Sequence, residues 1–142
     1  MGEFSAIKIE PLAQSHLPSI EAIQNHSREA ARWPVNSYLL YDSWVALRGE
    51  ETLGFLVIRH VDSRESEVLN LAVRAESRRQ GIARSLLEHV LSSTDRTWYL
   101  EVRESNQPAI QLYASLGFVL AGRRTNYYND PIEAAIVMRR QS

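Results

Sequence analysis

A strand, a helix and a second strand follow one another between residues 67 and 102. Residues 67–73 form a short apolar run that ends before a turn, and residues 98–102 form another. Between them, apolar side chains recur at helical spacing on one face: Ile82, Leu86, Leu87, Val90 and Leu91. Two strands joined through a helix run parallel in one sheet, because a tight turn joins only antiparallel strands. The chain is therefore predicted to fold as an α/β protein.

The remaining elements are predicted from turn residues and apolar spacing. Strands are expected near residues 7–9 and at 43–47, 52–61, 118–122 and 134–138, and helices from 15 or 18 to 31 and from 105 or 106 to 116. Pro34 is expected to stop the first helix, since proline disfavours helical geometry in the residue before it. Residues 48–51 are expected to form a hairpin turn and residues 123–133 a polar loop. No linker or repeat divides the chain, so residues 1–142 are predicted to form a single domain with one mixed sheet.

Composition excludes several classes of function. The chain has 142 residues, 44% of them apolar and 23% charged, which is typical of one globular domain. It has no cysteine and therefore no thiol nucleophile or thiolate metal site, and its four histidines do not cluster at metal-ligand spacing. The net charge of −1 argues against general nucleic-acid binding. No apolar run approaches the about 18 residues of a membrane span, and residues 1–13 lack the order of a signal peptide, so we expect a cytoplasmic protein without metal or membrane contact.

Positive charge is concentrated at the start of the predicted helix over 82–91. Residues 74–84 carry four arginines and one glutamate, which gives a local charge of +3. This is the unfavourable end for cations, because the exposed N–H groups and the macrodipole already make a helix N-terminus positive. Gly81 would let the backbone approach an anion, and Ala83 keeps a nearby position small. The pattern predicts a phosphate or pyrophosphate site, and a solvated basic helix start is the alternative.

Three stretches of the sequence resemble motifs of the GNAT N-acetyltransferases. The segment RRQGIA at 78–83 is similar to the family's acyl-CoA-binding motif, Arg/Gln-x-x-Gly-x-Gly/Ala. The segments LEVRESN at 100–106 and RTNYY at 124–128 resemble those of RimI-type members, which acetylate the N-terminal alanine of a small-subunit ribosomal protein. The resemblance implies the GNAT fold, a mostly antiparallel central sheet with a splayed parallel pair in its middle and helices on both faces.

By this resemblance the chain uses acetyl-CoA as co-substrate and needs no metal. The backbone of strand 71–73 would bind the pantetheine arm and polarise the thioester carbonyl, and the loop after it would hold the pyrophosphate. Asn106 would contact the cofactor arm, although its position also suits a helix cap. The residues implied to bind acetyl-CoA are Leu71, Ala72, Val73, Arg78, Arg79, Gln80, Gly81, Ile82, Ala83, Arg84 and Asn106.

Two side chains are implied to catalyse the transfer. Glu101 would act as the general base, through water, and Tyr113 as the acid that protonates the thiolate of CoA. Glu101 lies on the polar face of strand 98–102, where an ion pair with an arginine is the alternative role. Tyr113 lies at apolar spacing in the helix that ends at Leu116, where core packing is the alternative. A tyrosine hydroxyl, with a reference pKa near ~10, is protonated at pH 7 and can donate its proton.

The acceptor is implied to be the N-terminal α-amine of a protein, such as a small-subunit ribosomal protein. An α-amine with a pKa near ~8 is ~10% neutral at pH 7, whereas a lysine near ~10.4 is ~0.04% neutral. Trp33, Tyr127 and Tyr128 are the candidate acceptor-binding residues. At the first of these positions the chain has Trp33-Pro34, where the resembling enzymes have Pro-Trp. The two tyrosines could instead cover the sheet edge. A small-molecule amine is the alternative acceptor, and a non-catalytic acyl-CoA-binding module is a third reading. We expect a monomer or a weak dimer.

Overall fold

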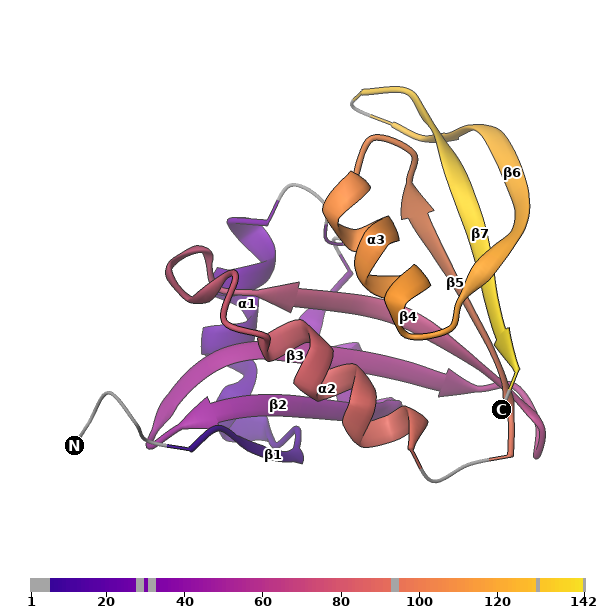
Figure 1. Cartoon of the computed structure of the whole chain (residues 1–142). Helices are drawn as coiled ribbons and strands as arrows, with labels where there is room; N and C mark the ends of the chain where they lie inside the picture. The colour runs from indigo at the N-terminus through magenta and orange to yellow at the C-terminus, as the bar shows by residue number, and fades with distance from the viewer. Residues whose placement is uncertain (1–5, 28–29, 31–32, 93–94, 130, 142) are drawn as a thin grey trace. The chain divides into compact units, whose positions relative to one another are not determined.

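The computed structural model describes residues 6–27, 30, 33–92, 95–129 and 131–141. Among these residues, seven strands pair in the order β1-β2-β3-β4-β5-β7-β6, with one parallel pair, β4 and β5 (Figure 1). The chain divides into two compact units, the first formed by Met1–Arg59 and Leu69–Ser92 and the second by His60–Val68 and Ser93–Ser142. The predicted α/β fold class with a mixed sheet is confirmed, and the single domain stays a prediction.

Antiparallel strands form the sheet of the first unit. β1 (Lys8–Pro11) pairs with β2 (Asp42–Arg48), and β2 pairs with β3 (Glu51–His60) as the predicted hairpin. Gly49 has φ +62° in the turn, a conformation that a residue without Cβ adopts at no steric cost. Two short 3-10 turns belong to the same unit, η2 (Gln14–His16) and η3 (Val35–Leu40).

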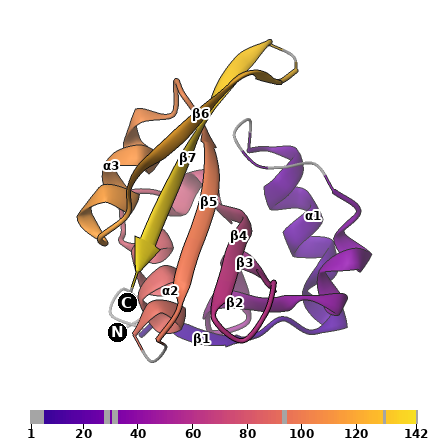
Figure 2. The same cartoon turned by 90° about the vertical axis from the view of Figure 1, so that its right-hand side faces the viewer.

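Helices cover both faces of the strands in the first unit (Figure 2). Val45 of β2 belongs to one buried core cluster with α1 (Leu17–Asn25). Trp44 points from the opposite face of β2, and its ring packs edge-on against His89 of α2 (Ile82–Leu91), with 4.6 Å between ring centroids. The predicted helix over 82–91 is therefore confirmed. Within the described residues, none of the helices has the length and apolar character needed to cross a membrane.

The first helix is shorter than predicted, because it ends at Asn25 and not at Ala31. The Nδ1 atom of His26 lies 2.8 Å from the carbonyl oxygen four residues earlier, and the Ser27 hydroxyl donates to the carbonyl four residues before it at 2.7 Å. Polar side chains that bond to nearby carbonyls compete with continuation of the helix. The helix end is therefore set well before Pro34, which was the predicted stop.

The second unit is built around β5 (Thr97–Arg103). The first half of β4 (Glu65–Val73) pairs with β5 in parallel from Glu65 to Val68, and β5 pairs along its length with β7 (Glu133–Gln141). α3 (Gln107–Ser115) lies across one face of β5 and β7 (Figure 1). The strand over 98–102 and the short helix before Gly117 are confirmed.

The predicted loop over 123–133 is wrong, because most of it belongs to two long strands. β6 (Val119–Tyr128) pairs with β7 as an antiparallel hairpin, with register shifts at Leu120/Gly122 and Arg124/Tyr128. β6 is the edge of the sheet, and its side chains are mostly exposed. An edge strand that is solvated on both faces shows no alternation of apolar and polar residues, so its sequence looks like a loop.

Candidate functional site

The arginine-rich loop leads from β4 into α2 in the first unit. The 3-10 turn η4 (Ala75–Ser77) is followed by Arg78 in extended backbone, Arg79 at φ +66° and Gly81 at φ +77°. The left-handed conformation is free of strain for glycine and uncommon for arginine. A strained residue beside a helix start is typical of ligand-binding loops.

The start of α2 has the properties of an anion site. Arg78, Arg79, Gln80 and Gly81 are exposed, and no described side chain caps the helix. A Cβ built at Gly81 would meet no atom within 4 Å, so the glycine leaves open space in front of the first-turn N–H groups. Arg84 lies in that first turn and is half-buried. The geometry fits the diphosphate of CoA, and the role of these residues as its ligands stays a prediction.

Two further arginines shape this loop. Arg74 forms ion pairs with Glu51 at 2.8 Å and Glu76 at 3.0 Å, so part of the local positive charge is neutralised within the protein. Arg48, at the end of β2, donates from Nη2 to Oε1 of Gln80 at 3.3 Å. This contact leaves the NH₂ group of Gln80 as its donor for an anion. Sequence reasoning missed Arg48, because it lies outside the motif and only strand pairing brings it to the loop.

The strand predicted to bind pantetheine is held closely by its neighbour. A Cβ built at Gly54 of β3 would lie 2.8 Å from the carbonyl oxygen of Ala72 and 3.2 Å from Cγ2 of Val73. The N–H of Leu71 donates to the side-chain oxygen of Asn70 at 3.0 Å. Ala72 is buried, whereas the other two residues of the predicted trio are half-buried. Pantetheine binding by this backbone stays a prediction.

A buried polar network ties Trp33 to the same strand. Asn70 donates from Nδ2 to Oε1 of Gln24 at 3.2 Å and to the Tyr38 hydroxyl at 3.1 Å, and that hydroxyl also donates to Oε1 of Gln24. Gln24 in turn donates from Nε2 to the Trp33 carbonyl at 2.7 Å. Burial raises the pKa of Tyr38, so its hydroxyl keeps the proton that this network uses. Trp33 itself stays 38% exposed, and its contact with an acceptor stays a prediction.

Glu101 lies in the second unit among groups from the C-terminal hairpin. Its Oε2 is 3.2 Å from Nε of Arg124, and its Oε1 is 3.5 Å from the Tyr127 hydroxyl. The Oε2 atom is inaccessible to solvent, and the contact with Arg124 does not have hydrogen-bond geometry. The ion pair that was the alternative role of Glu101 is thus present. It leaves Oε1 as the less constrained oxygen of a carboxylate that is 28% exposed.

Strand register explains how Arg124 reaches Glu101 across β7. Arg103 of β5, Ala135 of β7 and Arg124 of β6 form one row on one face of the sheet. Ala135 is small, so the Arg124 side chain can pass over β7 toward Glu101. The other face of β5 and β7 is covered by α3 (Figure 1), and Arg140 of β7 on that face donates from Nε to the carbonyl of Leu116, just after α3, at 2.8 Å.

Tyr113 and Tyr128 both have raised pKa values. Tyr113 is buried on α3 with its ring 5.8 Å from that of Phe118, and burial, with a smaller effect from Tyr128, raises its pKa. Burial first, and then the negative charge of Glu101, raise the pKa of Tyr128 to about 12. Tyr128 therefore interacts electrostatically with both predicted catalytic side chains. The acid role of Tyr113 stays a prediction.

Asn106 caps α3, as its position indicated. Its Oδ1 accepts a hydrogen bond from the Ala109 N–H at 3.3 Å, with Pro108 in the first turn. The cap leaves the Nδ2 group of Asn106 as a donor, and its contact with the cofactor arm stays a prediction.

The two tyrosines of the C-terminal hairpin form an aromatic cluster with arginines. The rings of Tyr127 and Tyr128 meet edge-on with 5.1 Å between centroids. The guanidinium of Arg103 lies 4.5 Å from the centre of the Tyr128 ring, and that of Arg124 lies 5.4 Å from the centre of the Tyr127 ring. Sequence reasoning named the tyrosines but missed both arginines. The LEVRESN segment contained a signal for Arg103, since an arginine that ends a strand on the same face as Glu101 can be expected to have a partner.

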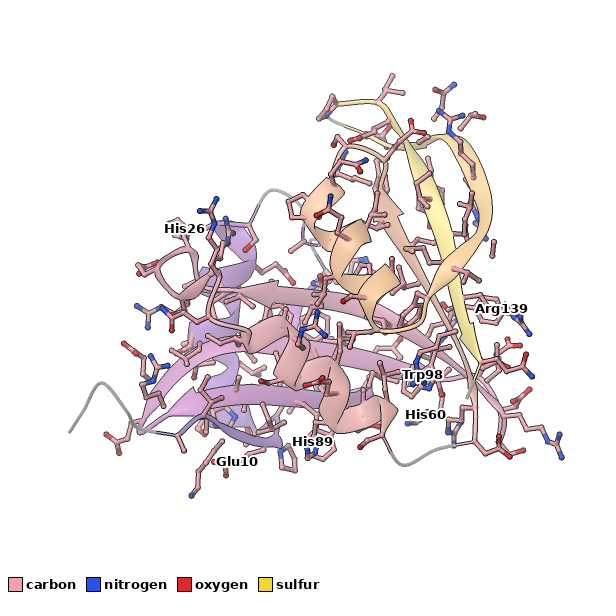
Figure 3. The ribbon with its side chains drawn as sticks, viewed as in Figure 1. Glu10, His26, His60, His89, Trp98 and Arg139 are labelled. Carbon is pink, nitrogen blue, oxygen red and sulfur yellow. The ribbon has the colours of Figure 1, made fainter. Side chains whose placement is uncertain are left out.

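The histidines make local contacts in separate places. Figure 3 labels His26 after α1, His60 at the end of β3 and His89 on α2. The Nδ1 atom of His60 lies 2.7 Å from the Ser66 hydroxyl. In the described part of the chain, no three histidine or acidic side chains are grouped so that they could hold a metal ion.

Comparisons of sequence place these features in a known family. Residues 10–118 match the acetyltransferase (GNAT) family. The [ribosomal protein bS18]-alanine N-acetyltransferase of Escherichia coli K12 is 46% identical over 80 residues, which cover 52% of this chain and 54% of that protein. The chain therefore spans about half the length of the curated relatives it matches.

Solved structures extend the similarity over nearly the whole chain. The crystal structure of the ribosomal-protein-S18-alanine N-acetyltransferase from Escherichia coli has a TM-score of 0.85 at 32% identity, covering 96% of this chain and 94% of that one. NAA60 of Arabidopsis thaliana in complex with acetyl-CoA has a TM-score of 0.82 at 22% identity, covering 96% and 100%. At this lower identity the likeness concerns the fold alone. The predicted resemblance to RimI-type enzymes is confirmed.

Proposed function

The chain belongs to the acetyltransferase (GNAT) family, and on this premise we propose that it transfers an acetyl group from acetyl-CoA to the N-terminal α-amine of a protein. The observation that carries the proposal is the setting of Glu101. This carboxylate is held on one side by Arg124, and its other oxygen lies near the Tyr127 hydroxyl of an exposed hairpin. A fixed carboxylate beside aromatic side chains suits proton removal from a peptide amine.

The loop before α2 supports the choice of acetyl-CoA as donor. Gly81 leaves open space at an uncapped helix start, and Arg78 and Arg79 are exposed beside it. First-turn N–H groups and arginines together suit a diphosphate. We assign the adjacent strand 71–73 to the pantetheine arm, whose thioester supplies the activated acetyl group.

The chain's own residues would act as base and acid in the transfer. Glu101 would accept, through water, the proton that the attacking amine loses as its C–N bond to the acetyl group forms. Tyr113 would donate its hydroxyl proton to the sulfur as the C–S bond breaks. Its raised pKa keeps this proton in place over the physiological range. A backbone N–H of the strand 71–73 would stabilise the negative charge on the thioester oxygen.

An α-amine is the acceptor best matched to a carboxylate base. At pH 7 its neutral, reactive form is over a hundredfold more abundant than that of a lysine side chain. The Escherichia coli relative is named for the alanine N-terminus of ribosomal protein bS18, which makes a small-subunit ribosomal protein our candidate acceptor. A ribosomal acceptor implies that the enzyme works in the cytoplasm.

An acetylation assay with the purified protein tests this function. We expect acetyl transfer from acetyl-CoA to a peptide that begins with alanine, and none to the same peptide with a blocked N-terminus. Mass spectrometry should place the acetyl group on the α-amine. Turnover of small amines such as spermidine without turnover of the peptide would contradict the peptide acceptor.

Two substitutions test the proposed chemistry. Glu101→Gln and Tyr113→Phe should each lower kcat by about 10²-fold or more, because each removes a proton-transfer group while keeping its shape. Glu104→Gln is the matched control, since Glu104 is a carboxylate of the same unit that pairs with Arg123 at 2.7 Å. Calorimetry should show acetyl-CoA binding unchanged in all three. Full activity of both catalytic variants would contradict the mechanism.

A further inference from the structure

We propose that Arg103 is a positioning residue for the acceptor, which fixes Tyr127 and Tyr128 beside Glu101 by clamping the end of the β6–β7 hairpin. The role of Arg103 rests on the proposed function, because it concerns how the enzyme binds its acceptor. Arg103 lies at the end of β5, two residues after Glu101 on the same face of the strand.

The clamp consists of hydrogen bonds from Arg103 to backbone and side chain of the hairpin end. Nη1 donates to the Pro131 carbonyl and to Oε1 of Glu133, both at 3.3 Å, and Nη2 donates to the Asn129 carbonyl at 3.2 Å. The face of the same guanidinium lies over the Tyr128 ring. One side chain thus holds the hairpin on both sides of its tip.

Glu133 completes the clamp from β7. Its Oε2 accepts the backbone N–H of Ser105 at 2.5 Å, while Oε1 accepts Arg103. The side chains of Arg103 and Glu133 are each only 15% exposed, so the pair is screened little by water. Ser105 belongs to the turn that leads from β5 into α3. The RESN part of the segment at 103–106 therefore links strand, turn and hairpin.

Only an arginine satisfies all of these contacts. The planar guanidinium offers donors in a fixed fork and an aromatic-stacking face at the same time, whereas a lysine presents one ammonium group. A lysine could keep the ion pair with Glu133 but could not also bond to two carbonyls and cover the Tyr128 ring. Without the clamp, Tyr127 and Tyr128 would have to become ordered when the acceptor binds.

Loss of the Arg103 clamp should weaken binding of the acceptor but not binding of acetyl-CoA. In the described part of the chain, the hydrogen bonds of the Arg103 side chain go to Asn129, Pro131 and Glu133, so their loss should leave acetyl-CoA affinity unchanged. Among the described residues, Arg103 forms no hydrogen bond or ion pair with Glu101, so kcat at saturating acceptor should fall far less than KM for the acceptor rises. Ordering two aromatic side chains on binding corresponds to a rise in KM of about tenfold.

Steady-state kinetics of the full chain test the proposal with Arg103→Lys, Arg103→Gln and Glu133→Gln. We expect acceptor KM to rise in the order wild type, Arg103→Lys, Arg103→Gln, with acetyl-CoA Kd unchanged by calorimetry. The matched control is Arg123→Lys, which breaks the bidentate pair with Glu104 in the same unit; among the described residues, both side-chain hydrogen bonds of Arg123 go to Glu104. The control should keep the wild-type acceptor KM.

Hydrogen exchange measured by mass spectrometry provides a second readout that needs no turnover. Exchange should rise in Arg103→Gln in peptides covering residues 119–129 and 131–141, and stay unchanged over α3. An unchanged exchange pattern, or an acceptor KM that stays at the wild-type value, would overturn the proposal. If Arg103→Gln fails to fold, Arg103→Lys and Glu133→Gln carry the same test. A wild type that acetylates no amine would instead contradict the proposed function, while hydrogen exchange would still decide the clamp.

Discussion

At the scale of single residues, the loop before α2 contains backbone strain at Arg79. This residue has φ +66°, which costs an L-residue of order 1 kcal/mol compared with glycine. Neighbouring Arg78 has an ordinary φ of −68°. The two arginines carry equal charge but differ in strain, so they can be compared directly.

We predict that Arg79→Gly raises thermal stability or leaves it unchanged while it weakens acetyl-CoA binding. The substitution relieves the left-handed strain but removes a cation from the anion site. Arg78→Gly is the control, because it removes the same charge without relieving strain and should lower stability. Differential scanning fluorimetry and calorimetric titration with acetyl-CoA measure the two effects. Equal changes of stability in both variants would contradict the strain at Arg79.

A second residue-scale prediction concerns Gly54, whose added Cβ would lie 2.8 Å from the Ala72 carbonyl oxygen. Gly54→Ala should lower the free energy of unfolding by about 1–3 kcal/mol, because backbone must shift to admit the methyl group. The shift should also weaken acetyl-CoA binding through the strand 71–73. Gly122→Ala is the control, since its Cβ would lie 3.9 Å from Val137. Urea titrations of both variants should differ clearly, and equal losses would rule out the close approach at Gly54.

At the scale of elements, α3 joins the cap at Asn106 to the predicted acid at Tyr113. Asn106→Ala should destabilise the protein by about 1 kcal/mol, because the Ala109 N–H loses its side-chain acceptor. Asn106→Ser keeps a cap but removes the amide group. If Asn106 also contacts the cofactor arm, Asn106→Ser should retain stability in urea titration and still raise KM for acetyl-CoA. An unchanged KM would leave Asn106 as a cap alone.

The elements also show where sequence reasoning succeeds. Strands and helices with buried faces, such as α2 and β5, were predicted within one or two residues because burial imposes a periodic pattern. The end of α1 and the course of β6 were predicted wrongly. Local side-chain bonds of His26 and Ser27 ended α1 early, and the solvated edge strand β6 has no apolar alternation. Register across β7, which brings Arg124 to Glu101, is set by pairing and leaves no signal in the sequence.

At the scale of the whole molecule, stability should fall toward both acid and alkaline pH. Hydrogen bonds from Arg123 and from Ser105 lower the pKa of Glu104 and Glu133 in the folded state. Their contribution to stability is present above the unfolded pKa near ~4.3 and is lost as pH falls through the lower folded value. Tyr113 and Tyr128 have raised pKa values, so their contribution to stability is present below the unfolded pKa near ~10. It is lost as pH rises through the folded pKa, which is about 12 for Tyr128.

We therefore predict that the free energy of unfolding declines below about pH 4 and above about pH 10. Urea titrations over this range measure it. Glu133→Gln should reduce the acid decline and Tyr128→Phe the alkaline one, each without affecting the other side. If both variants show the same pH dependence of unfolding as the wild type, the roles assigned to Glu133 and Tyr128 would be contradicted.

From the sequence alone, the α/β class, the family and the strand position of Glu101 were predicted and are confirmed. The anion site at the start of α2 was also predicted from the sequence and stays a prediction. These features could be predicted because each depends on residues close together in the sequence: a periodic pattern of buried side chains, a glycine at a turn, or a charge at an unexpected position. Three sets of contacts are visible only in the folded chain: those around Glu101, the bond from Arg48 to Gln80 and the bonds from Arg103 to the C-terminal hairpin. Those contacts join residues that are far apart in the chain, and strand pairing and register, which no short stretch encodes, bring them together.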